Sequence, residues 1–139
     1  MKKIFLGGTC NNSTWRNELI PILEKLKIKY FNPVVDDWTE KCVEIENQEK
    51  DIYCNCHLYV ITPKMTGVYS IAELIESVHM PNKLTIFCYL EKDENLFFTK
   101  GQLKSLDNVG KLVIKHNGIV CNSLTELQTI LKNIRKISL

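Results

Sequence analysis

A carboxylate near the start of an expected helix is the first residue whose position suggests chemistry. Glu73 lies in the segment TGVYSIAELIES (66–77), which follows the apolar run LYVIT (58–62) after three residues. A carboxylate one short loop beyond a buried strand can act as a nucleophile or as an acid–base group. Glu73 also completes the pattern Ser70-x-x-Glu73, in which the serine caps the helix and the glutamate bonds back to the cap residue. The spacing alone leaves both interpretations open.

The chain contains its own control for this pattern. Ser123-x-x-Glu126 repeats it at the start of the last expected helix, where we expect nothing catalytic. The pattern by itself therefore favours a helix cap. The location of Glu73 favours function, because the residue follows a strand expected to be central and buried on both faces.

Polar residues also follow the first two expected strands. The Gly-Gly turn after the first strand would let a ligand's phosphate or sugar approach the backbone and the following helix, although such turns also occur for steric reasons alone. The two aspartates before Trp38 are either hydroxyl acceptors beside an aromatic ring or part of a solvated turn. The candidate ligand-binding residues in these segments are Gly7, Gly8, Thr9, Asn32, Asp36 and Asp37.

Cysteine and histidine spacing does not indicate a metal site. Cys54-x-Cys56 is followed by His57, but structural zinc sites usually pair cysteines at C-x2-C spacing with a second pair elsewhere, which this chain lacks. The three histidines (His57, His79 and His116) show no pairing with a serine or cysteine that suggests a catalytic triad. We expect neither a metal nor another cofactor.

Length and charge limit the classes of protein. A chain of 139 residues fits a single domain spanning 1–139. Its net charge is +2 with both signs scattered, so a nucleic-acid partner is not favoured. No apolar run is long enough to cross a bilayer or to act as a secretion signal. We expect a cytoplasmic protein with reduced thiols and no membrane partner.

Short apolar runs alternate with longer amphipathic stretches along the chain. Strands are expected at 3–7, 29–33, 57–62 and 84–90, with one or two short strands after residue 110. Helices are expected from Asn12 or Ser13 as cap, after Thr39, around Glu73, over 99–110 with Gly110 as its end, and from Ser123. Residues 91–98 are expected to form a loop.

This alternation predicts an α/β fold. Specifically, we expect a flavodoxin-like (Rossmann-like) three-layer sandwich around a five-stranded, mainly parallel sheet. In such folds the ligand binds at the carboxyl ends of the strands, near the point where the strand order reverses. The polar residues that follow the strands would meet there.

Three segments together resemble one known family. KIFLGGT (3–9), FNPVVDDW (31–38) and LYVITPKMTGVYSIAELIES (58–77) are similar to the nucleoside 2-deoxyribosyltransferase-like family, and closest to its small, poorly characterised branch. The resemblance implies a flavodoxin-like domain, commonly a homo-oligomer, that breaks the N-glycosidic bond of a small-molecule nucleoside or nucleotide. It also implies a glutamate nucleophile on the helix after the third strand, and Glu73 matches that position.

The same resemblance implies further site residues. Gly7, Gly8 and Thr9 match the loop that lines the base or sugar pocket, and Asn32, Asp36 and Asp37 match the second-strand loop. Well-studied transferases carry a sugar-binding aspartate where this chain has Gly67, while Ser70 fits the small branch. The family's carboxylate on the second helix, which helps protonate the leaving base, matches Glu46 or Glu49, or is replaced by Asn47.

The residues and the resemblance together leave three candidate functions. The first is an enzyme that transfers or hydrolyses the glycosyl group through Glu73. The second is a non-catalytic nucleotide-binding sensor or accessory module that has lost hydroxyl recognition at Gly67. The third is hydrolysis of a larger N-glycoside such as NAD, to which the same carboxylate chemistry applies.

Overall fold

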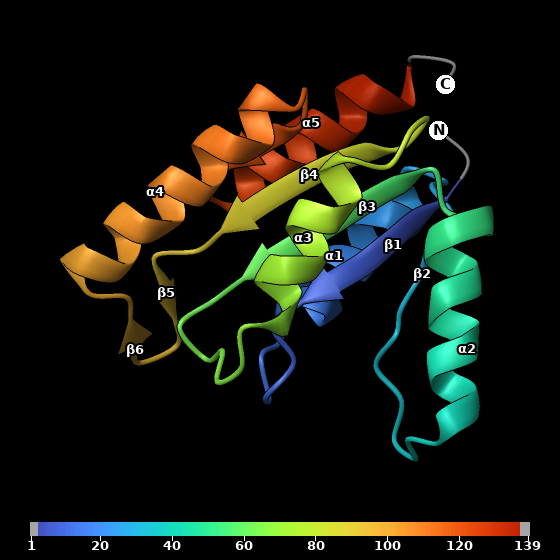
Figure 1. Ribbon diagram of the computed structural model, residues 1–139, viewed down its shortest axis with the longest axis horizontal. Helices are drawn as coiled ribbons and strands as arrows, with labels where there is room; N and C mark the ends of the chain where they lie inside the picture. The colour runs from blue at the N-terminus through green and yellow to red at the C-terminus, as the bar shows by residue number, and fades with distance from the viewer. Residues whose placement is uncertain (1–2, 137–139) are drawn as a thin grey trace.

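The computed structural model describes residues 3–136, which form one parallel sheet between layers of helices (Figure 1). The strand order is β2-β1-β3-β4-β7, and every neighbouring pair is parallel. The strands are β1 (Ile4–Gly8), β2 (Tyr30–Phe31), β3 (Cys56–Ile61), β4 (Leu84–Tyr89) and β7 (Ile119–Cys121). This is the flavodoxin-like order, so the predicted fold class is confirmed.

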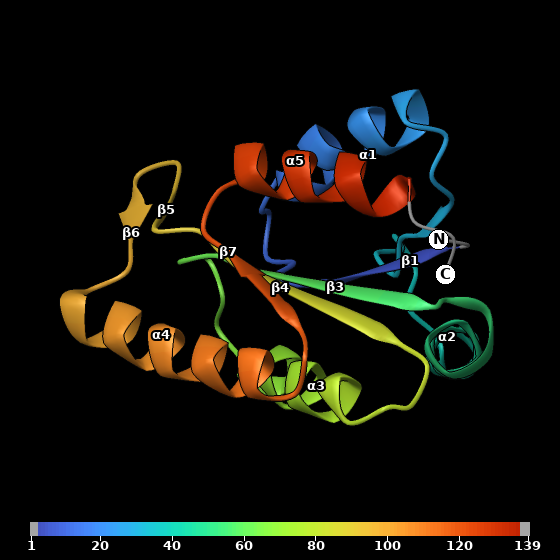
Figure 2. The same ribbon diagram turned by 90° about the horizontal axis from the view of Figure 1, so that it is seen from above.

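Helices cover both faces of the sheet. Figure 2 shows α1 (Trp15–Lys25) and α5 (Leu124–Arg135) on one face, with α3 (Tyr69–Val78) and α4 (Lys100–Lys115) on the other. The helix α2 (Glu40–Gln48) continues into a π-helical turn, η1 (Glu49–Tyr53), and lies beside β1 and β2 at the sheet edge (Figure 1). None of the helices within residues 3–136 combines the length and the apolar character that a bilayer crossing requires.

The central strands bury side chains on both faces of the sheet. All six residues of β3 are buried, as its continuous apolar character predicts. Leu6 and Leu58 pack with the helices of the α1 and α5 layer, while Phe5 and Tyr59 face the α3 and α4 layer. This alternation along neighbouring strands fixes which residues can reach each helix.

Two local predictions were wrong. Gly110 does not end its helix, because α4 continues to Lys115. A Cβ at Gly110 would lie 3.3 Å from Val120, so the glycine permits close packing of α4 on β7 instead. Residues 91–98 contain a small antiparallel hairpin, β5 (Lys92–Asp93) and β6 (Leu96–Phe97), whose turn residue Glu94 has a φ of 53°.

Among α1, α2 and α5, the predicted helix start was right at two helices and wrong at the first. Thr39 occupies the N-cap of α2 and Ser123 that of α5, as expected. The first helix begins at Trp15, after both expected caps, and Thr14 occupies its cap position. Ser13 Oγ instead donates to Asp93 Oδ2 at 2.6 Å, which ties the loop after β1 to the β5–β6 hairpin.

Candidate functional site

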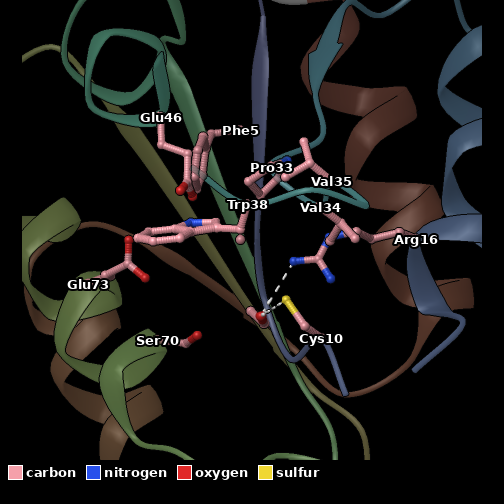
Figure 3. A pocket seen from close by; sticks show the side chains of 12 residues that line it. Phe5, Cys10, Arg16, Pro33, Val34, Val35, Trp38, Glu46, Ser70 and Glu73 are labelled. Carbon is pink, nitrogen blue, oxygen red and sulfur yellow. Dashed lines mark hydrogen bonds between the residues drawn. The ribbon is translucent and has the colours of Figure 1, made fainter. Parts of the chain in front are cut away.

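A pocket of about 310 Å³ lies at the carboxyl end of β1, between the segment after β2, the helix α2 and the helix α3 (Figure 3). One part of its wall is apolar and the other carries carboxylates and a hydroxyl. The apolar side chains are Phe5, Pro33, Val34, Val35 and Trp38, and the polar groups include Glu46, Ser70 and Glu73. Its volume falls within the range of small-molecule sites.

The two glycines at the end of β1 form part of the pocket wall and are also required by packing. A Cβ at Gly8 would lie 2.1 Å from the carbonyl oxygen of Val60, and the φ of Gly8 is 114°. A Cβ at Gly7 would lie 2.7 Å from the Tyr59 ring. Both positions therefore allow β1 to lie close to its neighbours and leave its backbone accessible to the pocket.

A buried arginine holds the loop that follows β1. The guanidinium of Arg16 donates to the carbonyl oxygens of Leu6 at 2.9 Å and Thr9 at 2.8 Å, and its side chain lines the pocket. Thr9 Oγ1 accepts from the backbone N–H of Thr62 at 3.0 Å, which connects the loops after β1 and β3. Arg16 was missed from sequence because a charged residue in an amphipathic helix normally faces solvent.

Glu73 does not participate in a helix cap. The helix α3 begins at Tyr69 with Val68 in the cap position, and within the described part of the chain no side chain caps it. The capping box predicted from Ser70 and Glu73 was therefore wrong. Lys50 Nζ instead donates to Glu73 Oε2 at 2.5 Å, with the two side chains only 10% and 17% exposed.

The second helix presents one of its two candidate acids to the pocket. Glu46 lines the pocket, whereas Glu49 pairs with Lys3 at 2.8 Å and accepts from the Cys54 thiol. Burial raises the pKa of the Glu46 carboxyl above its ordinary value. The charge of Lys50 opposes this increase, and the charges of Glu73, which raises the pKa, and of Arg16, which lowers it, have smaller effects. A raised pKa is what a general acid requires near neutral pH.

Lys50, which the sequence did not single out, reaches the site through its ion pair with the pocket residue Glu73. Burial lowers its pKa, but the hydrogen bond and charge of Glu73, together with Tyr69 and Glu46, outweigh burial and leave the pKa above its ordinary value. Its ammonium also lies 5.5 Å from the centre of the Phe5 ring. The sequence does contain one signal that could have found Lys50. It follows Glu46 by four residues, and residues at this spacing are neighbours on a helix.

A chain of buried hydrogen bonds lies behind Lys50. His57 Nε2 is 2.8 Å from the Lys50 carbonyl oxygen, which only accepts, so Nε2 donates. His57 Nδ1 then accepts from Ser77 Oγ at 2.9 Å, and Ser77 Oγ accepts from the Tyr59 hydroxyl at 2.7 Å. Burial lowers the pKa of His57 to about 4, in keeping with this neutral form. The chain joins η1, β3 and α3.

A second, smaller pocket adjoins the first. Its volume is about 190 Å³, and it shares Gly8, Cys10 and Ser70 with the first pocket. Thr9 and Gly67 line this second pocket. A Cβ added at Gly67 would meet no atom within 4 Å, so the space at this position is open.

The segment after β2 contributes different residues from those expected. Asn32 Oδ1 accepts from the backbone N–H of Val34 at 3.1 Å and so stabilises a turn. Asp36 and Asp37 are exposed and line neither of these two pockets. Trp38 does line the first pocket, and Figure 3 shows its indole extending toward Glu73.

The cysteines and histidines do not assemble a metal centre in the described structure. Within residues 3–136 no three side chains of His, Cys, Asp or Glu are grouped as a metal ion would require. Cys54 and Cys56 are buried, and burial raises the pKa of each thiol to about 12. Both thiols are therefore protonated at neutral pH in this structure.

Comparison with known proteins gives one match. The family model described as nucleoside 2-deoxyribosyltransferase like matches residues 1–91. These residues include β1, the segment after β2, α2, β3 and α3, and therefore all the elements that build the first pocket. No curated protein and no solved structure gives a significant match.

Proposed function

Because the chain belongs to the nucleoside 2-deoxyribosyltransferase-like family, we propose that it cleaves the N-glycosidic bond of a nucleoside or nucleotide, with Glu73 as the nucleophile. One observation carries this proposal: Glu73 and Glu46, from different helices, face one pocket in unlike environments. Glu73 is paired with a lysine ammonium, whereas burial raises the pKa of Glu46. Two carboxylates in unlike environments can divide the roles of nucleophile and acid.

The reaction proceeds by two displacements at C1′ of the sugar. A carboxylate oxygen of Glu73 attacks C1′ as the bond to the base nitrogen breaks, and the electron pair of that bond goes to the nitrogen. Glu46 gives its carboxyl proton to the leaving base. An acceptor base or water then attacks C1′ of the glycosyl ester, Glu46 takes up the proton of this second nucleophile, and the Glu73 carboxylate is released.

The pocket walls suit the two halves of such a substrate. Phe5, Val35 and Trp38 provide an apolar and aromatic surface for a planar base. Gly7, Gly8 and Ser70 provide accessible backbone and a hydroxyl for the sugar. We assign the sugar to the side nearer Ser70 because the adjoining pocket, which shares Gly8 and Ser70, leaves room for a 5′ substituent.

Exposed apolar side chains around the site support the expected homo-oligomer. Val68 and Tyr69 are each 74% exposed, and Trp38 is 64% exposed. Exposed aromatic residues of this kind are enriched at protein interfaces. A second copy of the chain that covers these residues would also shield the pocket from water.

A non-catalytic nucleotide-binding module is the second candidate function. The observation that favours it is the open space at Gly67, where the resemblance to well-studied transferases would place a sugar-binding aspartate. A pocket without that carboxylate can retain a nucleotide and lack productive orientation of the sugar. This function predicts that nucleotides raise the melting temperature while no base is released.

One assay separates the two functions. The purified protein is incubated with nucleosides, their 5′-monophosphates and NAD, with and without an acceptor base, and free base is measured by chromatography. The matched variants are Glu73→Gln and Glu49→Gln, since both remove a carboxylate that pairs with a lysine. Base release that is lost in Glu73→Gln and kept in Glu49→Gln supports the enzyme. Binding without release in folded wild-type protein contradicts it and supports the binding module.

A further inference from the structure

We propose that Lys50 is a shared counter-ion that follows the negative charge from Glu73 to Glu46 during the reaction. This inference rests on the proposed function, because it assigns a role to a third residue of the same site. Lys50 is neither the nucleophile nor the acid of that function. The contacts of Lys50 and the change of charge on Glu73 and Glu46 during the two displacements support this role.

Lys50 is paired with Glu73 and interacts electrostatically with Glu46. Its ammonium is 2.5 Å from Glu73 Oε2 on α3. Glu46 precedes it by four residues on the continuous α2–η1 segment, and a glutamate four residues before a lysine is the favourable order for a helical ion pair. Lys50 and Glu46 act electrostatically on each other, as do Glu46 and Glu73.

The backbone of Lys50 is anchored separately from the ammonium at the end of its side chain. Its carbonyl oxygen accepts from His57 Nε2, and the chain through Ser77 and Tyr59 anchors that histidine under α3. The long lysine side chain retains rotatable bonds between this anchor and its ammonium. The ammonium can therefore exchange one carboxylate partner for the other without movement of η1.

The first displacement transfers the negative charge of the site. Before it, Glu73 is a carboxylate and Glu46 carries a proton. After it, Glu73 is a neutral glycosyl ester and Glu46 is a carboxylate, because its proton has gone to the leaving base. A partly buried carboxylate without a counter-ion is unfavourable, so the lysine stabilises whichever group is charged. The second displacement returns Lys50 to Glu73.

Other charged and titratable groups also face these residues. Tyr69 from α3 acts on Lys50, and Arg16 from α1 acts on Glu46. Glu73 itself acts on Tyr59 of β3. Tyr69, Arg16 and Tyr59 keep their partners in both displacements. Their effects on the pKa of Glu46 should therefore be the same in all variants of Lys50 and Glu73.

The test is a titration of the Glu46 carboxyl carbon by NMR in wild type, Glu73→Gln, Lys50→Met and the double variant. Glutamine at position 73 imitates the neutral ester, and Glu46→Gln identifies the signal. We expect Glu73→Gln to lower the pKa of Glu46, and to lower it more when Lys50 is present than in the Lys50→Met background. Equal decreases in the two backgrounds would show that Lys50 does not change partner, and would overturn the proposal.

A matched ion pair provides the control. Lys3 pairs with Glu49 outside the pocket, so Lys3→Met should leave the Glu46 titration unchanged. A shift as large as that in Lys50→Met would mean that the response is a general charge effect, and would contradict the proposal.

Kinetics give a second, independent measurement. If wild type releases base, Lys50→Met should lower kcat by on the order of 100-fold with little change in KM, while Lys50→Arg retains most of the activity. Full kcat in folded Lys50→Met would overturn the inference. Failure of the proposed function is distinguishable from failure of the inference, because it would appear as an inactive wild type, whereas the titration requires no turnover.

Discussion

The two Ser-x-x-Glu segments share a sequence pattern and differ in structure. In α5, Ser123 occupies the N-cap, its Oγ accepts from the backbone N–H of Glu126 at 3.0 Å, and the glutamate side chain is exposed. In α3 the helix has already begun at Tyr69, so Ser70 lies in the first turn and lines the pocket. A displacement of the helix start by two residues thus releases Glu73 from capping and presents it to Lys50.

The two helices are also anchored by different means. The start of α5 is secured by its serine cap, while α3 is attached near its other end through Ser77, His57 and Tyr59. A helix without a side-chain cap at its start leaves those first N–H groups available to other partners. The serine therefore stabilises the start of α5, whereas the start of α3 has no side-chain cap and its serine lines the pocket.

Removal of the two glutamates should give the largest contrast. Glu73→Gln is expected to lower base release by several orders of magnitude, because an amide cannot form the glycosyl ester. Glu126→Gln should leave the rate within about twofold of wild type, since surface changes away from a site have small effects. Chromatographic rates for both variants measure this contrast. Equal rates would contradict the assignment of Glu73.

The anchor of α3 should make stability depend on pH. The pKa of His57 is about 4 in the folded protein and about 6.5 in an unfolded chain, so its contribution is fully present above pH 6.5. It declines as the pH falls from 6.5 to 4, because only the unfolded chain takes up the proton. The loss reaches about 3 kcal/mol.

Urea unfolding of wild type and His57→Gln at pH 7 and pH 4.5 measures this contribution. The difference in unfolding free energy between the two proteins should shrink at the lower pH, since glutamine does not titrate. A difference that is the same at both pH values would contradict the neutral, buried histidine.

Glu46 and Glu49, two of the carboxylates of the α2–η1 segment, offer a second contrast near the site. Glu46→Gln is expected to lower kcat about 100-fold, the contribution of a general acid, whereas Glu49→Gln should retain nearly full activity. The effect of Glu46→Gln should be smaller on substrates whose leaving base needs no protonation. Rates with bases of different basicity test this, and a uniform loss would exclude the acid role of Glu46.

The two serines should differ by a smaller amount in stability. Ser123→Ala removes a cap and should lower the free energy of unfolding by about 1 kcal/mol. Ser70→Ala removes no cap and should change it by less than about 0.5 kcal/mol. Urea denaturation of the two variants provides the comparison. A larger cost at Ser70 would indicate a structural role for its hydroxyl that the helix start does not suggest.

Much of the fold could be predicted because its signals are local. The apolar run at β3 and its neighbours located the central strands, and their alternation with amphipathic stretches indicated the parallel sheet. The prediction failed at Gly110, where glycine suggested a helix end. Contact with Val120 of β7 explains the glycine instead, and that contact joins two separate elements.

The site was predictable only in part. Glu73 and the Gly-Gly turn stood out by type and position, and both line the first pocket. Asp36 and Asp37 were expected beside a ligand, yet they point into neither pocket because the segment after β2 turns its apolar residues inward. His57 was set aside because its partner Ser77 lies 20 residues away and no sequence spacing connects them.

The sequence by itself determined the order of the elements, the buried central strands and the supply of carboxylates near the strand ends. These properties depend on the side-chain periodicity of each segment. Only the tertiary structure decided that Glu46 rather than Glu49 reaches the pocket, that Glu73 pairs with Lys50, and that the start of α3 bypasses the serine cap. Lys50 and Glu73 are 23 residues apart, and their contact joins η1 to α3, which no periodicity within either segment can predict.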